Sequence, residues 1–167
     1  MKLSDDILKE LKDYNKRNIS KISDIIVHCS DSDIPAHDDI KVIHEWHLKR
    51  GFICVGYHFF ITKNQQPRIQ TGRPIQFYGS HCRGHNKRSI GICLSGKNLF
   101  TKQQFINLSQ LVVSLDTILP KTLRVSPHNK FNKSKTCPNF QFTHDVTELF
   151  DGVNWQYTGE INDYTCN

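Results

Sequence analysis

Long apolar stretches are missing from this chain of 167 residues. No apolar run approaches the roughly 20 residues that a membrane-spanning helix requires, so the sequence predicts no such helix. The first residues, Met1 to Glu10, are charged and lack the apolar segment and small-residue cleavage site of a secretory leader. We therefore expect a protein made in the cytoplasm without a signal peptide.

Internal repeats, low-complexity tracts and linkers rich in proline, glycine or serine are also missing. A chain of this length fits one domain with one core. Hydrophobic residues make up 37% and charged residues 23%, which is typical of a globular protein. The sequence therefore predicts a single globular domain.

No part of the chain concentrates its positive charge, although the formal net charge is +6. A basic balance favours an anionic partner such as a nucleic acid, a membrane surface or an anionic polymer. A nucleic-acid surface would need basic residues interleaved with aromatic ones on one face, and the sequence has no such array. We expect neither a nucleic-acid nor a membrane partner.

Apolar periodicity predicts alternating strands and helices. Strands are expected at 25–29, 54–62 and 89–94, where β-branched and other apolar residues run together. A first helix is expected near the N-terminus, a second over about 38–50, and a third from Thr101 to Pro120, opened by a capping box with Gln104. A short strand at 123–125, a polar loop over 126–139 and a last helix near 146–150 complete the pattern. This order predicts an α/β domain with a central mixed sheet flanked by helices.

Histidine and cysteine residues supply the candidate site. Cys54 and Cys93 lie in apolar runs and are expected to be core residues, and a chain of this length needs no disulfide framework. Zinc binds thiolates and imidazoles readily, and a catalytic zinc keeps one position open for water. His28, His128 and Cys137 are the candidate ligands, although their spacing alone is a weak signal.

Several short motifs occur in a fixed order along the chain. They are Val27-His28-Cys29-Ser30, Val55-Gly56-Tyr57-His58-Phe59, Gly79-Ser80-His81 with Asn86 and Ser89-Ile90-Gly91, and Pro127-His128 with Lys135-Thr136-Cys137-Pro138. In this order they closely resemble the type 2 N-acetylmuramoyl-L-alanine amidases, a family that includes small phage endolysins and is similar to animal peptidoglycan recognition proteins. The resemblance runs from about Ile25 to Phe150, which suggests an N-terminal helical extension at 1–24, a zinc amidase domain at 25–152 and a tail at 153–167.

The resemblance also implies a reaction: zinc-dependent hydrolysis of the amide bond between N-acetylmuramic acid and L-alanine in bacterial peptidoglycan. It implies zinc ligands at His28, His128 and Cys137, catalytic residues at Tyr57 and Lys135, and substrate-binding residues at His81 and Asn86. A zinc site of this kind lowers the pKa of water toward about 7. Lys135 and zinc are suited to stabilise the carbonyl oxygen, while Tyr57 is suited to hydrogen bonding or proton transfer.

Other interpretations stay open from the sequence. A recognition module that holds peptidoglycan without cutting it typically lacks the ligand cysteine, and Cys137 is present here. A cysteine hydrolase would use Cys29 or Cys137 as the nucleophile, but a thiolate held by zinc is not free to attack. We expect a monomer that acts on peptidoglycan or muropeptides, either inside the cell or on a wall reached by lysis, delivery or non-classical export. Lysis, wall recycling, defence and antibacterial competition are all compatible roles.

Overall fold

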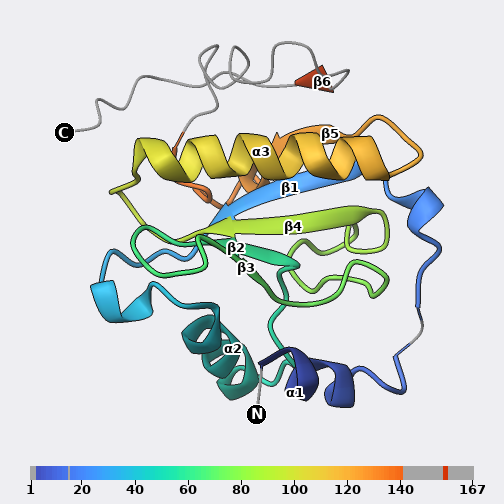
Figure 1. Cartoon of the computed structure of the whole chain (residues 1–167), viewed down its shortest axis with the longest axis horizontal. Helices are drawn as coiled ribbons and strands as arrows, with labels where there is room; N and C mark the ends of the chain where they lie inside the picture. The colour runs from blue at the N-terminus through green and yellow to red at the C-terminus, as the bar shows by residue number, and fades with distance from the viewer. Residues whose placement is uncertain (1–2, 15, 141–155, 158–167) are drawn as a thin grey trace.

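A computed structural model describes residues 3–14, 16–140 and 156–157. Within these residues six strands form one sheet in the order β3-β2-β4-β1-β5-β6. The strands are β1 (Asp24–Cys29), β2 (Phe59–Ile61), β3 (Ile69–Thr71), β4 (Ser89–Leu94), β5 (Arg124–Pro127) and β6 (Gln156–Tyr157). Helix α3 (Lys102–Ile118) covers one face, and α1 (Leu3–Glu10) and α2 (Ile40–Lys49) lie on the other (Figure 1).

Strand β1 lies near the middle of the sheet, between β4 and β5, and all six of its residues are buried. It pairs in parallel with both neighbours, the β2–β4 and β5–β6 pairings are also parallel, and β2 pairs antiparallel with β3. Since side chains alternate along a strand, Ile25 and Val27 point toward α3 and His28 points to the opposite face. The predicted mixed sheet is confirmed.

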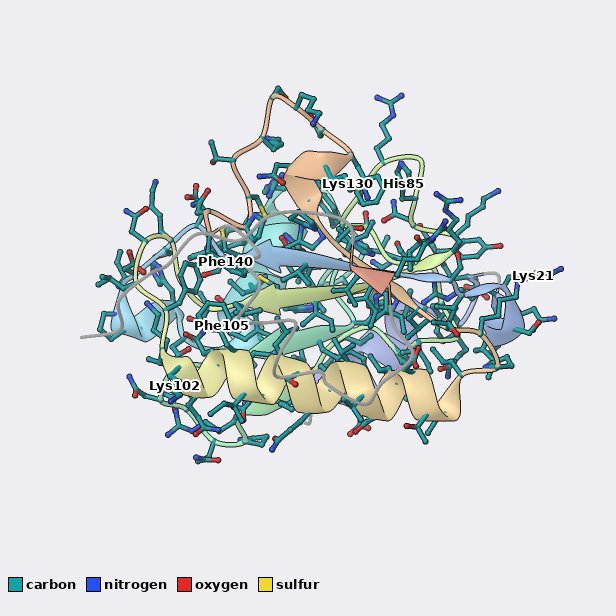
Figure 2. All side chains as sticks on the ribbon, turned by 90° about the horizontal axis from the view of Figure 1, so that it is seen from above. Lys21, His85, Lys102, Phe105, Lys130 and Phe140 are labelled. Carbon is teal, nitrogen blue, oxygen red and sulfur yellow. The ribbon has the colours of Figure 1, made fainter. Side chains whose placement is uncertain are left out.

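Helix α3 is positioned by the predicted capping box and by its apolar face. The Thr101 hydroxyl accepts a hydrogen bond from the Gln104 backbone, and the Gln104 side chain accepts one from the Thr101 backbone. The Gln104 amide also donates to the carbonyl oxygens of Ile61 (3.2 Å) and Ser95 (2.7 Å), which ties the helix to the ends of β2 and β4. Phe140 packs edge-on against Phe105 of α3, with ring centroids 5.1 Å apart (Figure 2).

Helices α1 and α2 share a second apolar cluster on the opposite face. Ile40 and Ile43 of α2 pack there with Phe60 of β2, and the side chains of Ile7 and Leu11 are fully buried in the same cluster. The segment before β1 therefore includes a packed helix. The division into 1–24, 25–152 and 153–167 stays a prediction, and the helix expected near 146–150 lies outside the described residues.

The expected strand at 54–62 is shorter than its apolar pattern predicted, because only Phe59–Ile61 forms a strand. The backbone N–H groups of Val55 and Gly56 instead donate to the Nδ1 atoms of His44 (3.1 Å) and His47 (2.9 Å) on α2. These hydrogen bonds to side chains replace part of the strand ladder. None of the helices in the described ranges is long and apolar enough to cross a membrane.

Candidate functional site

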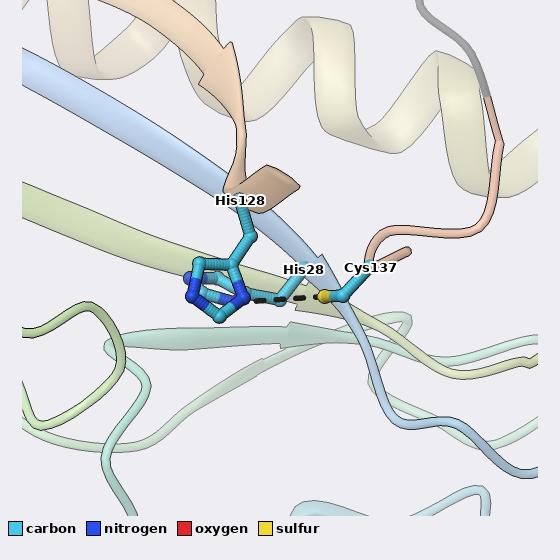
Figure 3. A group of neighbouring side chains, drawn as sticks. All are labelled: His28, His128 and Cys137. Carbon is cyan, nitrogen blue, oxygen red and sulfur yellow. Dashed lines mark hydrogen bonds between the residues drawn. The ribbon is translucent and has the colours of Figure 1, made fainter. Parts of the chain in front are cut away.

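Two neighbouring parallel strands bring the candidate ligands together. Val27 of β1 is paired with Pro127 of β5, so the next residues, His28 and His128, emerge side by side. Cys137 approaches them from the loop that follows β5 (Figure 3). The potential ligand atoms of the three residues lie within 4.8 Å of one another, and His28 Nδ1 is 3.7 Å from Cys137 Sγ. The structure therefore gathers the three residues that the sequence singled out.

The loop carrying Cys137 is held by its own backbone. The Asn129 N–H donates to the carbonyl oxygen of Cys137 at 2.9 Å, which closes the loop next to His128. The Cys29 N–H, at the end of β1, donates to Cys137 Sγ at 3.3 Å. The sulfur is thus fixed between two strand ends.

The protonation states favour metal binding through neutral imidazoles. Burial, followed by the nearby His81, His128 and His47, holds the pKa of His28 well below its usual value. Burial and then the Lys135 ammonium lower the pKa of His128. Both imidazoles are therefore neutral at pH 7 and keep a nitrogen lone pair for a ligand. The hydrogen bond with the Cys29 side chain, followed by burial, raises the pKa of the Cys137 thiol, and both outweigh the opposite effect of the Cys29 backbone N–H.

A cavity of about 310 Å³ opens over this cluster. Its lining combines the three candidate ligands with Tyr57, Lys135 and His81, and also with residues that the sequence did not single out for the site. The latter include Asp31, Arg50, Phe52 and Ser80. Arg50 and Phe52 lie a few residues before the Gly56-Tyr57-His58 motif, and the Arg50 guanidinium lies 5.3 Å from the centroid of the Phe52 ring.

The proposed catalytic residues both face this cavity. The Tyr57 ring centroid is 5.1 Å from that of His28, and burial, with the nearby Cys93, raises the pKa of its hydroxyl well above the usual value. Tyr57 is therefore a protonated hydrogen-bond donor at neutral pH. Lys135 is exposed on the Cys137 loop and lines the same cavity.

Of the two residues expected to bind substrate, His81 lines the cavity and Asn86 does not. His81 lines the cavity, but its Nδ1 atom is 3.0 Å from His28 Nε2. The Asn86 side-chain oxygen instead accepts hydrogen bonds from the backbone of His81 and Cys82, each at 2.9 Å, and Asn86 does not line the cavity. Asn86 shapes the loop that presents His81, and its role in substrate binding stays a prediction.

The chain matches the N-acetylmuramoyl-L-alanine amidase family model over residues 16–140. The endolysin of Enterobacteria phage K11 is 31% identical over 156 residues, covering 89% of this chain and 93% of that protein. The endolysin of Escherichia phage T7 is 33% identical over 129 residues, covering 70% and 80%.

Solved structures give the same answer for the fold. The amidase LysC from Clostridium intestinale is 27% identical, with a TM-score of 0.66 over 82% of this chain and 89% of that one. Drosophila PGRP-LB is 20% identical, with a TM-score of 0.62 over 90% of this chain and 88% of that one, which is a likeness of fold alone. The family match and the phage relatives confirm the resemblance seen in the motifs: the chain belongs to the N-acetylmuramoyl-L-alanine amidase family.

Proposed function

We propose that this peptidoglycan amidase uses a zinc ion held by His28, His128 and Cys137 to hydrolyse the bond between N-acetylmuramic acid and L-alanine. The observation that carries the proposal is that the potential ligand atoms of these three residues lie within 4.8 Å of one another. All three residues line the same cavity. The family to which the chain belongs gives the reaction class.

The spacing of the donors fits zinc. Typical bond lengths of about 2.3 Å to sulfur and about 2.05 Å to nitrogen, with a tetrahedral angle, place the two donor atoms about 3.6 Å apart. The His28 Nδ1 to Cys137 Sγ distance is 3.7 Å. The cluster in the described part of the chain has three members, which is the number of protein ligands expected of a catalytic zinc with one open position.

A bound zinc ion of this kind supplies an activated water near neutral pH and polarises the scissile carbonyl. Lys135 brings a positive charge to the same cavity, where it can stabilise the negative charge that develops on the carbonyl oxygen. Tyr57 offers a hydroxyl whose raised pKa keeps its proton available for hydrogen bonding at the reacting centre. We assign Lys135 to stabilising the oxyanion and Tyr57 to orienting the nucleophile or assisting the leaving amine.

The substrate is expected to lie along a polar groove. A second cavity continues from the first, and Asp31, Lys135, Thr136 and Asn139 line both. A variant of Drosophila PGRP-LB has been solved in complex with tracheal cytotoxin, which supports binding of a muropeptide in the corresponding fold. A monomer is expected, with release to the cell wall before it acts there.

Digestion of purified peptidoglycan, with mass spectrometry of the products, tests the function. Free peptides that begin at L-alanine should appear, disappear on chelation, and return when zinc is added back. Cys137→Ser should abolish both zinc content and product. Cys82→Ser is the matched control, because Cys82 is buried outside the cluster and should leave both unchanged.

The alternative is a recognition module without activity. Binding of peptidoglycan by a zinc-loaded protein that releases no peptide would support that alternative and refute the enzymatic proposal. Peptide release that persists in fully metal-free protein would refute the zinc dependence alone.

A further inference from the structure

The imidazole of His81 occupies a slot made by two glycines. A Cβ atom added at Gly91 of β4 would lie 2.5 Å from His81 Cδ2, and one added at Gly79 would lie 2.7 Å from His81 Nε2. Both separations are far below van der Waals contact, so any larger residue at either position would displace the ring. The fold therefore holds the His81 ring flat against β4, on the face where His28 emerges.

The hydrogen bonds of His81 have one consistent direction. His28 directs its Nδ1 toward Cys137 Sγ, so the proton of a neutral His28 ligating through Nδ1 must be on Nε2. That nitrogen is 3.0 Å from His81 Nδ1, which then accepts the hydrogen bond. The His81 Nε2–H in turn faces the Ser89 hydroxyl at 3.4 Å, and Ser89 donates to the carbonyl oxygen of His85 at 2.9 Å.

The backbone around His81 is fixed independently of this chain of hydrogen bonds. Asn86 accepts from the N–H groups of His81 and Cys82, and the Ser80 N–H donates to the Gly56 carbonyl oxygen at 2.9 Å. The glycine slot, the fixed backbone and the direction of the hydrogen bonds all place His81 Nδ1 against His28 Nε2.

We infer that His81 is a positioning residue for the metal ligand His28. It accepts the Nε2–H of His28, which selects the tautomer and ring orientation that present Nδ1 to the metal. This inference rests on the proposed zinc function, and it gives His81 a different task from the substrate binding that the sequence suggested. Partners that orient a ligating histidine typically contribute about 10–100-fold to metal affinity.

Three variants separate this role from a general structural one. His81→Leu removes the acceptor at similar volume, whereas His81→Asn places an amide oxygen where Nδ1 was. Gly91→Ala leaves His81 in the sequence but fills the slot. His37→Leu is the control, because His37 pairs with Ser32 and packs on Trp46, away from the cavity lining.

Two measurements are made on each folded variant, with circular dichroism to confirm the fold. The first is nitrogen-15 NMR of the His28 ring in metal-free protein at neutral pH, which reports the tautomer. The second is zinc affinity by competition with a chromogenic chelator. We expect wild type and the control to show His28 protonated on Nε2. We expect His81→Leu and Gly91→Ala to lose that single tautomer and bind zinc about 10–100-fold more weakly, and His81→Asn to recover most of both.

The outcomes distinguish the inference from the function on which it rests. A wild-type His28 protonated on Nδ1 would overturn the inference even if zinc binds and the amidase is active. Unchanged tautomer and zinc affinity in His81→Leu, with weaker muropeptide binding, would overturn it in favour of a substrate contact. A wild-type protein that binds no zinc while His28 carries its proton on Nε2 would refute the zinc proposal, and the tautomers of His81→Leu and His81→Asn would still decide the positioning role.

Discussion

Replacing Arg17 with methionine should destabilise the protein strongly, because the guanidinium is almost completely buried, with 6% of the residue exposed. It donates to the carbonyl oxygens of Ile75 (2.6 Å), Ser89 (2.7 Å) and Asn86 (3.2 Å). These acceptors span the segment that carries His81. Arg17→Met keeps the apolar stem of the side chain and removes every donor.

The size of the loss follows from two opposing contributions. Hydrogen bonds from a charged donor contribute about 1.5–3 kcal/mol each, so three of them sum to about 4.5–9 kcal/mol. Burying the charge costs several kcal/mol, and within the described residues no ion pair joins Arg17 to a carboxylate. Burial lowers the pKa of Arg17 to about 10, so the group is still charged at neutral pH. We expect a net loss of about 3 kcal/mol in the free energy of unfolding.

Urea unfolding of the metal-free proteins at pH 7 measures this loss. With a slope of about 2 kcal/mol per molar urea, the midpoint of Arg17→Met should fall by about 1.5 M. Arg17→Lys should lie between it and wild type, because one ammonium cannot reach all three carbonyl groups. Arg83→Met is the control, since Arg83 is exposed in the same segment and should change stability by less than about 0.5 kcal/mol. A loss below about 1 kcal/mol for Arg17→Met would refute the reasoning.

Three further predictions concern the site and the helix above it. Zinc must displace the proton of Cys137, whose raised pKa keeps the thiol protonated, while the histidine ligands with their lowered pKa values are already neutral. Zinc affinity, measured by chelator competition, should therefore fall about tenfold when the pH is lowered from about 7.5 to about 6.5. An affinity that does not change with pH would count against Cys137 as a ligand. Tyr57→Phe and Lys135→Ala should each lower kcat by about 10²–10³-fold, with altered pH–rate profiles; two profiles identical to wild type would contradict the roles given to these residues. Gln104→Leu should cost about 2 kcal/mol by thermal or urea unfolding, because it removes the side-chain donor to the Ser95 carbonyl group and one of the two donors to the Ile61 carbonyl group, which keeps the Ser95 N–H; a loss like that of the exposed Gln110→Leu would argue against this contribution.

The sequence predicted the regular elements where one local signal dominated. The apolar run at Ser89–Leu94 is a strand over its whole length, and the capping box begins α3 where expected. The run at 54–62 was only partly a strand, because His44 and His47 of α2 take up its backbone donors. The histidines of α2 compete with a neighbouring strand for these backbone donors, and the apolar pattern of 54–62 alone does not show this. The three-residue strand β3 was too short to give a pattern at all.

In the candidate site too, the sequence predicted the residues that lie in motifs but not the contacts between distant segments. Motifs placed His28, His128 and Cys137 in one cluster, and the parallel pairing of β1 with β5 explains why two of them meet. The contact between His28 and His81 spans 53 positions in sequence and depends on the absence of side chains at Gly79 and Gly91. A glycine in a motif does not by itself say which ring it makes room for.

The wide separation of the ligands along the chain also bears on when the protein becomes able to act. His28 and Cys137 are 109 positions apart, so a nascent chain completes β1 long before Cys137, the last of the proposed ligands, leaves the ribosome. A metal that joins them closes a loop of about 100 residues, and a cross-link of that span is worth about 4.7 kcal/mol in chain-entropy models. Loading the metal should therefore be one of the last steps of maturation, and it should lock the two ends of the domain together. Unfinished or truncated chains that stop before Cys137 would carry only two of the three proposed ligands, and we expect them to be inactive on peptidoglycan.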